Sequence, residues 1–279
     1  MMDEHASALA FLQRLAKEVS EGTIDLPCFP DVVVRISLAL ADANTNADRI
    51  VTIVGAEPRL AARILQTANS AAFNSSGKAV TELRSAITRL GQQMVQGTAM
   101  SYAMQQMKNE QSLRPIAEPL AQLWNRSIAV ASLSRLVAAR TKVNADEAFL
   151  TGLLHGIGHL YILARSAASA NSESVMQSVA GWHASIGKAV LESWGFDQAL
   201  CDAVGEQEDR DRRWKHTATL ADILIASLVL ADSLPQDEPR VIASDGINAF
   251  LSIGVTPTDC TVILSQADEQ IRLIHEALG

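Results

Sequence analysis

Apolar residues recur at intervals of three or four along almost the whole chain, which is the spacing of one face of an α-helix. Val33, Ile36 and Leu40 form one such stripe, and Leu60 and Ile64 begin another. The alternation of apolar and polar residues that marks a half-buried strand is nearly absent. The pattern therefore predicts an all-α fold of many helices without a sheet.

Several helix ends can be predicted from local signals. Glu57-Pro58 marks a helix start, because the N–H that proline lacks would have no acceptor in the first turn. Asn144, with Glu147 three residues later, resembles a capping box. Gly195 is suited to a C-terminal glycine cap and Asp197 to the N-cap of the next helix. The sequence thus predicts two helices that meet at residues 195–197.

The most apolar stretch runs from Ile223 to Ala231 and is closed at its ends by Asp222 and Asp232. It has less than half of the roughly 20 residues that a membrane span requires, so we expect a buried helix. Residues 1–22 carry charges throughout and contain no uninterrupted apolar core of the signal-peptide kind. We therefore expect a cytoplasmic protein.

Composition excludes several classes of function. With 31 acidic against 23 basic residues, the net charge of -8 argues against nucleic acid or anionic membrane as a main partner. Cys28, Cys201 and Cys260 are odd in number and widely spaced, which indicates neither a disulfide framework nor a thiolate zinc site. No phosphate-binding loop or nucleophile elbow occurs, which excludes nucleotide hydrolysis through a phosphate loop. We expect no cofactor.

Two helical lobes are the expected organisation. Residues 109–118 contain Pro115 and look like a connector, so we place the boundary there. The first lobe would comprise residues 1–115. The second, residues 116–279, would include a C-terminal helical segment from about residue 242 to 278 and no attached output domain. Residues 168–174 and 234–240 are further polar breaks.

His155 and His159 are the first candidates for chemistry. Four residues apart, they would share one face of a helix, as the zinc histidines of an H-E-x-x-H motif do. That motif needs a glutamate after the first histidine, and this chain has Gly156 there. We favour a structural role, with His155 packed and hydrogen-bonded between helices and His159 facing outward. Metal binding is the alternative.

His183 and Asp232 could add imidazole and carboxylate ligands from other helices. Each also has a simpler interpretation: His183 as a half-buried surface residue beside Trp182, and Asp232 as a helix end. The stripe Met100, Met104 and Met107 is more typical of a core face than of a partner surface. A weaker candidate for a phosphate or an acidic partner is the basic group Arg210, Arg212 and Arg213.

Several separate stretches together resemble the HDOD domain family of bacterial signalling proteins, across roughly residues 20 to 235. The matching stretches are Leu26-Pro27-Cys28-Phe29-Pro30, Glu57-Pro58-Arg59-Leu60, Ala68-Asn69-Ser70-Ala71, Ala86-Ile87-Thr88-Arg89-Leu90-Gly91, Leu123-Trp124 with Ser127, and His183, Gly187, Trp194 and Gly195. The resemblance implies an N-terminal helical lobe and a C-terminal bundle derived from HD-type metal-dependent phosphohydrolases. In those enzymes an adjacent His-Asp pair holds the divalent ion that activates water.

The chain departs from the catalytic pattern of that resemblance at most ligand positions. Arg126 stands where the first metal histidine would be, and Gly156 where the aspartate would be. Gly205-Glu206-Gln207 replaces a frequent pair of histidines. By position, only His155 and Asp232 remain, and a cationic Arg126 would repel an ion further.

We therefore expect a non-catalytic HDOD signalling or regulatory scaffold that binds a partner protein, with no catalytic residues and a degraded metal site. One alternative is a divergent metal-dependent phosphohydrolase using His155, His183 and Asp232, with His159 as a further ligand. Another is a sensor in which Arg126 binds a small anionic or phosphorylated ligand. A salt bridge between Arg126 and an acidic neighbour is the simpler role for that residue.

Overall fold

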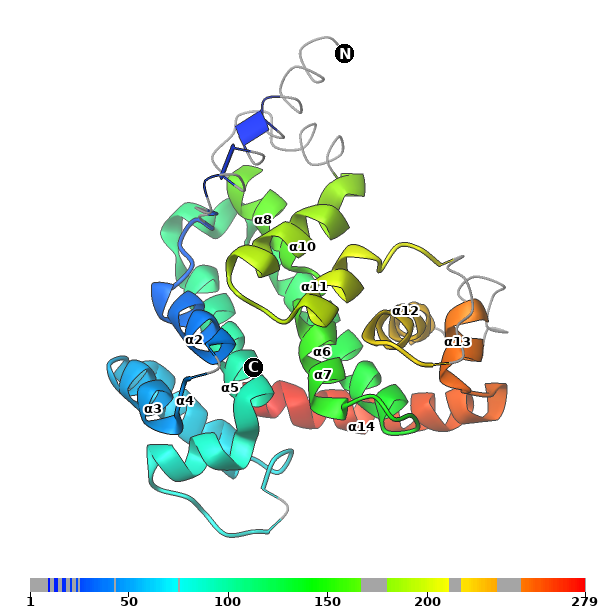
Figure 1. The fold of residues 1–279 in the computed structure, drawn as a ribbon, viewed down its shortest axis with the longest axis horizontal. Helices are drawn as coiled ribbons and strands as arrows, with labels where there is room; N and C mark the ends of the chain where they lie inside the picture. The colour runs from blue at the N-terminus through cyan, green and yellow to red at the C-terminus, as the bar shows by residue number, and fades with distance from the viewer. Residues whose placement is uncertain are drawn as a thin grey trace.

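The computed structural model describes residues 10, 13–14, 17–18, 21, 24, 26–42, 44–74, 76–166, 180–210, 217–234 and 247–278. Every regular element in these residues is helical, which confirms the predicted all-α fold (Figure 1). The helices are α2 (Asp31–Ala41), α3 (Ala47–Gly55), α4 (Pro58–Asn69), α5 (Leu83–Asn109), α6 (Ala117–Ala138), α7 (Ala145–Leu154), α8 (Ile157–Ser166), α10 (His183–Ser193), α11 (Gln198–Gly205), α12 (Leu220–Ala231), α13 (Ile247–Ile253) and α14 (Pro257–Leu278), with 3-10 turns η1 (Gln111–Ile116) and η2 (Ala180–Trp182).

The predicted helix ends are confirmed where local chemistry determines them. Pro58 is the first residue of α4, and the Asn144 side chain caps α7 by accepting from two backbone N–H groups. Gly195 follows α10 with a φ of +73°, a conformation that costs glycine little. The Asp197 side chain caps α11 by accepting from Ala199 N at 2.8 Å.

The N-terminal helices α2, α3 and α4 all pack against α5, and α4 makes the most extensive contact with it. α5 breaks at Gly91, whose φ of +74° lies in the left-handed region, so a glycine is favoured there. The Asn69 side chain at the end of α4 makes two hydrogen bonds of 2.8 Å with the Val80 backbone and so holds the following loop. Phe73 then lies under the Arg135 guanidinium of α6, at 5.3 Å from ring centroid to Cζ.

The second group of helices is centred on α6, α7 and α12, which contact one another extensively. α12 is buried from Ala221 to Ala231, as the apolar run predicted, and a capping box of Thr219 and Asp222 begins it. The methionine stripe of α5 is also buried, with Met100, Met104 and Met107 at most 3% exposed, so its interpretation as a core face is confirmed. In the described residues, no helix is long and apolar enough to cross a bilayer.

α14 returns from the second group of helices to the first, crossing α6 and ending beside α5 (Figure 1). Thr67 Oγ1 of α4 donates to the Ala277 carbonyl oxygen at 3.2 Å, and the Ser101 hydroxyl of α5 donates to that of Leu278. These side chains supply donors to carbonyl groups that a helix end leaves unpaired. Buried side chains on both sides of residue 115 form one cluster, and the division into two lobes there stays a prediction.

Candidate functional site

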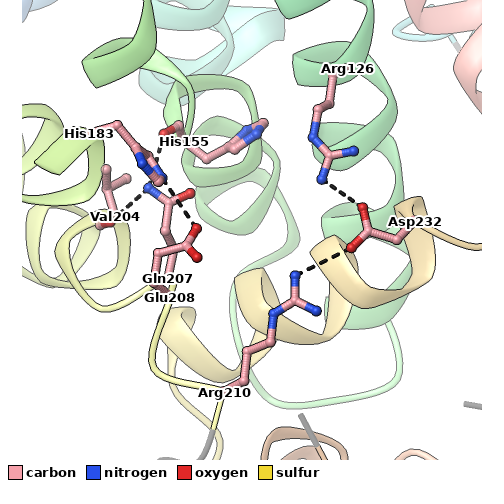
Figure 2. A network of polar contacts seen from close by, with 8 residues as sticks. All are labelled: Arg126, His155, His183, Val204, Gln207, Glu208, Arg210 and Asp232. Carbon is pink, nitrogen blue, oxygen red and sulfur yellow. Dashed lines mark hydrogen bonds and ion pairs between the residues drawn. The ribbon is translucent and has the colours of Figure 1, made fainter. Parts of the chain in front are cut away.

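A cavity of about 320 Å³ brings together four of the five candidate site residues. Side chains of α6, α8, α10 and α12, together with residues following α7 and α11, form its walls. The lining residues are Leu123, Arg126, His155, His159, Ile162, Leu163, His183, Gln207, Glu208 and Leu228. Asp232, the fifth candidate, joins this group through a hydrogen bond to Arg126 (Figure 2).

His155 is buried directly after α7, with 4% of its surface exposed. Its Nδ1 lies 2.7 Å from the Gly152 carbonyl oxygen, and because a carbonyl can only accept, Nδ1 carries the proton. Burial lowers the pKa of His155 to about 4; the hydrogen bond to Gly152 opposes this shift, and the Arg126 and His183 charges add to it. The ring is therefore neutral at pH 7, which confirms the expectation of a packed, hydrogen-bonded histidine.

His155 and His159 do not share one continuous helix, because α7 ends at Leu154 and α8 begins at Ile157. His159 also does not face outward as expected. Its ring stacks on that of His183, with ring centroids 3.9 Å apart and an interplanar angle of 24°. Burial lowers the pKa of His159 to about 4, and the charges of His183, His155 and Arg126 contribute.

His183 is buried rather than half-buried, at 8% exposure, whereas the neighbouring Trp182 is 52% exposed. Close approach of α8 and α10 explains this, since a Cβ on Gly158 would overlap the His183 carbonyl oxygen. His183 Nε2 lies 3.2 Å from Glu208 Oε1. The stacked rings of His159 and His183 thus present faces, not converging nitrogen lone pairs, to each other.

Asp232 is held between two arginines (Figure 2). Arg126 donates to Asp232 Oδ1 at 2.8 Å, and Arg210 to Asp232 Oδ2 at 3.3 Å. The simpler role of Arg126 as a salt-bridge partner is therefore confirmed, and Asp232 does cap the C-terminus of α12. Arg212 and Arg213 lie outside the described residues.

A side chain at Gly156 would meet the end of the Leu123 side chain, which would have to move. A Cβ there would lie 2.8 Å from Leu123 Cδ1 and 3.4 Å from Ser127 Oγ. In the described residues, no group of three or more His, Cys, Asp or Glu side chains is arranged to hold a metal ion. Asp232 is paired with Arg126 and Arg210, and the residue after His155 is a glycine, which offers no ligand atom of its own side chain.

Leu123, Gln207 and Glu208 are site residues that the sequence did not single out for these roles. Gln207 Nε2 donates to the carbonyl oxygens of Val204 at 2.9 Å and His155 at 3.1 Å, which ties the segment after α11 to the end of α7. No spacing signal connects these residues, since the contact between Gln207 and His155 spans 52 positions.

The described residues thus form an all-helical protein with a histidine-lined cavity between its helices. A family model for the HDOD domain matches residues 26–210, so the chain belongs to the HDOD domain family. One solved structure with the same fold is described as a candidate metal-dependent phosphohydrolase from Shewanella amazonensis SB2B. The two are 23% identical with a TM-score of 0.72, over 99% of this chain and 100% of that chain.

Two further structures share the fold. An HDOD domain protein with unknown function from Geobacter sulfurreducens is 23% identical with a TM-score of 0.61, over 95% of this chain and 96% of that chain. A candidate signal transduction protein from Marinobacter aquaeolei VT8 is 21% identical with a TM-score of 0.60, over 98% of this chain and 64% of that chain. Among curated proteins, an uncharacterized protein of Treponema pallidum (strain Nichols) is 22% identical in an alignment 208 residues long, which covers 68% of this chain but only 39% of that relative.

Proposed function

We propose that this protein is a non-catalytic HDOD signalling or regulatory scaffold that acts in the cytoplasm by binding a partner protein. The observation that carries the non-catalytic part is the pairing of Arg126 with Asp232 at 2.8 Å. A guanidinium there supplies the positive charge that a divalent ion would otherwise bring to the carboxylate. Arginine cannot lower the pKa of a bound water as a metal ion does.

The neighbouring histidines support the same proposal. His155 Nε2 is left with a lone pair, but the adjacent position is Gly156, so the neighbouring residue supplies no carboxylate to hold an ion beside it. The description of the Marinobacter structure as a candidate signal transduction protein is consistent with a signalling role.

Partner binding requires an accessible anchor, and Trp182 is the best candidate. It is 52% exposed, and the other large apolar side chains exposed in the described residues are aliphatic: Leu38, Leu251 and Val262. Tryptophan is enriched among residues that dominate binding energy at protein interfaces. We propose that the partner contacts Trp182, outside the histidine cavity.

The alternative is a divergent metal-dependent phosphohydrolase using His155, His183 and Asp232, with His159 as a further ligand. The description of the Shewanella structure and the gathering of three histidines in one cavity favour it. The second alternative, an anion sensor centred on Arg126, is weakened because Asp232 already occupies that guanidinium.

A partner-capture experiment tests the scaffold proposal. The full chain serves as bait in cross-linking and mass spectrometry, beside the variants His155→Ala, Arg126→Ala and Trp182→Ala. We expect the same partner with the wild type and both cavity variants, and weaker recovery with Trp182→Ala. Loss of the partner in the cavity variants alone would contradict the proposal, provided that all variants melt as the wild type does.

A further inference from the structure

A polar groove lies between α4 and α5. Neither of these helices lines the histidine cavity. The volume of the groove is about 350 Å³. Arg59, Arg63 and Gln66 of α4 face Gln105, Gln106 and Asn109 of α5 across it. Every one of these side chains can donate hydrogen bonds, and no carboxylate lines the groove.

The two arginines of this groove have no carboxylate within salt-bridge distance among the described residues. Arg63 donates instead to the neutral side-chain oxygen of Gln105. Arg49, Arg84 and Arg135, in contrast, each pair with an aspartate. Arg59 and Arg63 thus share one groove without an acidic partner, although acidic residues outnumber basic ones in this chain and its net charge is -8.

The unpaired charges carry an energetic cost. Arg59 and Arg63 lie four residues apart on one helix, where like charges repel. Arg63 is also partly buried, and burial lowers its pKa because the charged form is less well solvated. The Glu57 carboxylate interacts with the Tyr102 hydroxyl, whose pKa is raised mainly by burial and further by Glu57.

We propose that the groove between α4 and α5 binds the phosphate group of a phosphomonoester, with Arg59 and Arg63 as its cationic donors. The planar guanidinium fork matches phosphate oxygens better than an ammonium does. Gln66, Gln106 and Asn109 would provide neutral donors around the anion. A volume of about 350 Å³ leaves space beyond the phosphate for the group that carries it.

Binding measurements with the full chain test this assignment. Titration calorimetry at constant chloride concentration compares inorganic phosphate, AMP and adenosine, together with a phosphoserine peptide and its unphosphorylated counterpart. We expect saturable binding of phosphate and AMP, and none of adenosine. If the phosphopeptide binds and AMP does not, the groove is still a phosphate site, and the phosphate it binds belongs to a phosphorylated protein.

Variants locate the site. Arg63→Gln and Arg59→Gln should each weaken phosphate binding about tenfold or more, because a hydrogen bond to a charged group is lost. Arg35→Gln changes an exposed arginine of α2 outside the groove and should leave binding unchanged. Thermal melts of all three variants check the fold. Absence of saturable phosphate and AMP binding by the wild type, or an equal loss in Arg35→Gln, would overturn the proposal. Since neither variant touches the histidine cavity, failure here leaves the proposed scaffold function standing.

Discussion

Gly156 directly follows His155 and has no side chain that could offer an oxygen ligand to a metal ion. The structure adds an observation that the sequence could not give, because a new side chain there would press on the end of Leu123. That contact joins residues far apart in sequence and leaves no local signal. The absence of the carboxylate could be recognised from the sequence, but the contact with Leu123 could not.

Restoring the carboxylate should therefore not restore a metal site. We expect Gly156→Asp to lower the free energy of unfolding by about 1–3 kcal/mol through overpacking against Leu123, and to bind no Mn²⁺. Gly181→Asp is the matched control, because a Cβ there meets no atom within 4 Å. Urea denaturation gives the stabilities. Unchanged stability together with tight Mn²⁺ binding by Gly156→Asp would contradict the account.

His155 should make stability depend on pH. Its pKa is about 4 in the folded protein against an ordinary 6.5, so between these values the unfolded chain binds a proton that the folded chain does not. The free energy of unfolding should therefore be fully retained above pH 6.5 and fall as the pH is lowered toward 4, by up to about 3 kcal/mol.

Urea denaturation of wild type and His155→Gln between pH 4 and 7.5 measures this contribution. Other titrating groups largely cancel in the difference between the two proteins. We expect the wild type to lose more stability than the variant over that range. If the free energies of unfolding of the two proteins change equally with pH, His155 is not buried as a neutral ring.

At the scale of the helices, local signals predicted far more than long-range ones. Pro58, Asn144, Gly195 and Asp197 mark helix ends through contacts within a few residues, and each of these ends is confirmed, with Asn144 acting as an N-cap. The pairing of Arg126 with Asp232 spans 106 positions, and it could be named only as an unspecified acidic neighbour. His159 was predicted wrongly because its position depends on how closely α8 and α10 pack.

The C-terminus of α12 provides a test of the paired arginines. A carboxylate at a helix C-terminus is unfavourable with the helix dipole, and Arg126 and Arg210 offset it at Asp232. These side chains are 36–45% exposed, so each single change to Gln should cost less than about 1 kcal/mol.

The Arg126→Gln, Arg210→Gln double variant should lose more stability than either single one. Adding Asp232→Asn should recover part of that loss, because the unpaired charge is removed. Thermal denaturation at low salt is the suitable measurement. A loss of several kcal/mol in one single variant, or no recovery with Asp232→Asn, would show that the pair has another structural role.

For the whole molecule, the chain is tied together by contacts between distant segments. Phe29 stacks on Trp194 at 4.6 Å, and the end of α14 is held by Thr67 and Ser101. Helical periodicity predicted the fold class, and the family motifs predicted the family. Neither could predict that α14 packs back onto α4 and α5, since its apolar stripe does not identify its neighbours.

This arrangement leads to a prediction about cooperativity. With one continuous cluster of buried side chains, calorimetry should show a single unfolding transition whose calorimetric and van't Hoff enthalpies agree. Two separate transitions would instead support independent lobes divided near residue 115.

The central claim is that an arginine–aspartate pair stands where a metal ion would be held. Purified full-length protein is loaded with Mn²⁺, dialysed and analysed for metal content, and hydrolysis of bis(p-nitrophenyl) phosphate is measured beside His155→Ala. We expect no stoichiometric metal and no hydrolysis above that of the variant. One tightly bound ion per chain, with hydrolysis that is lost in His155→Ala, would contradict the claim.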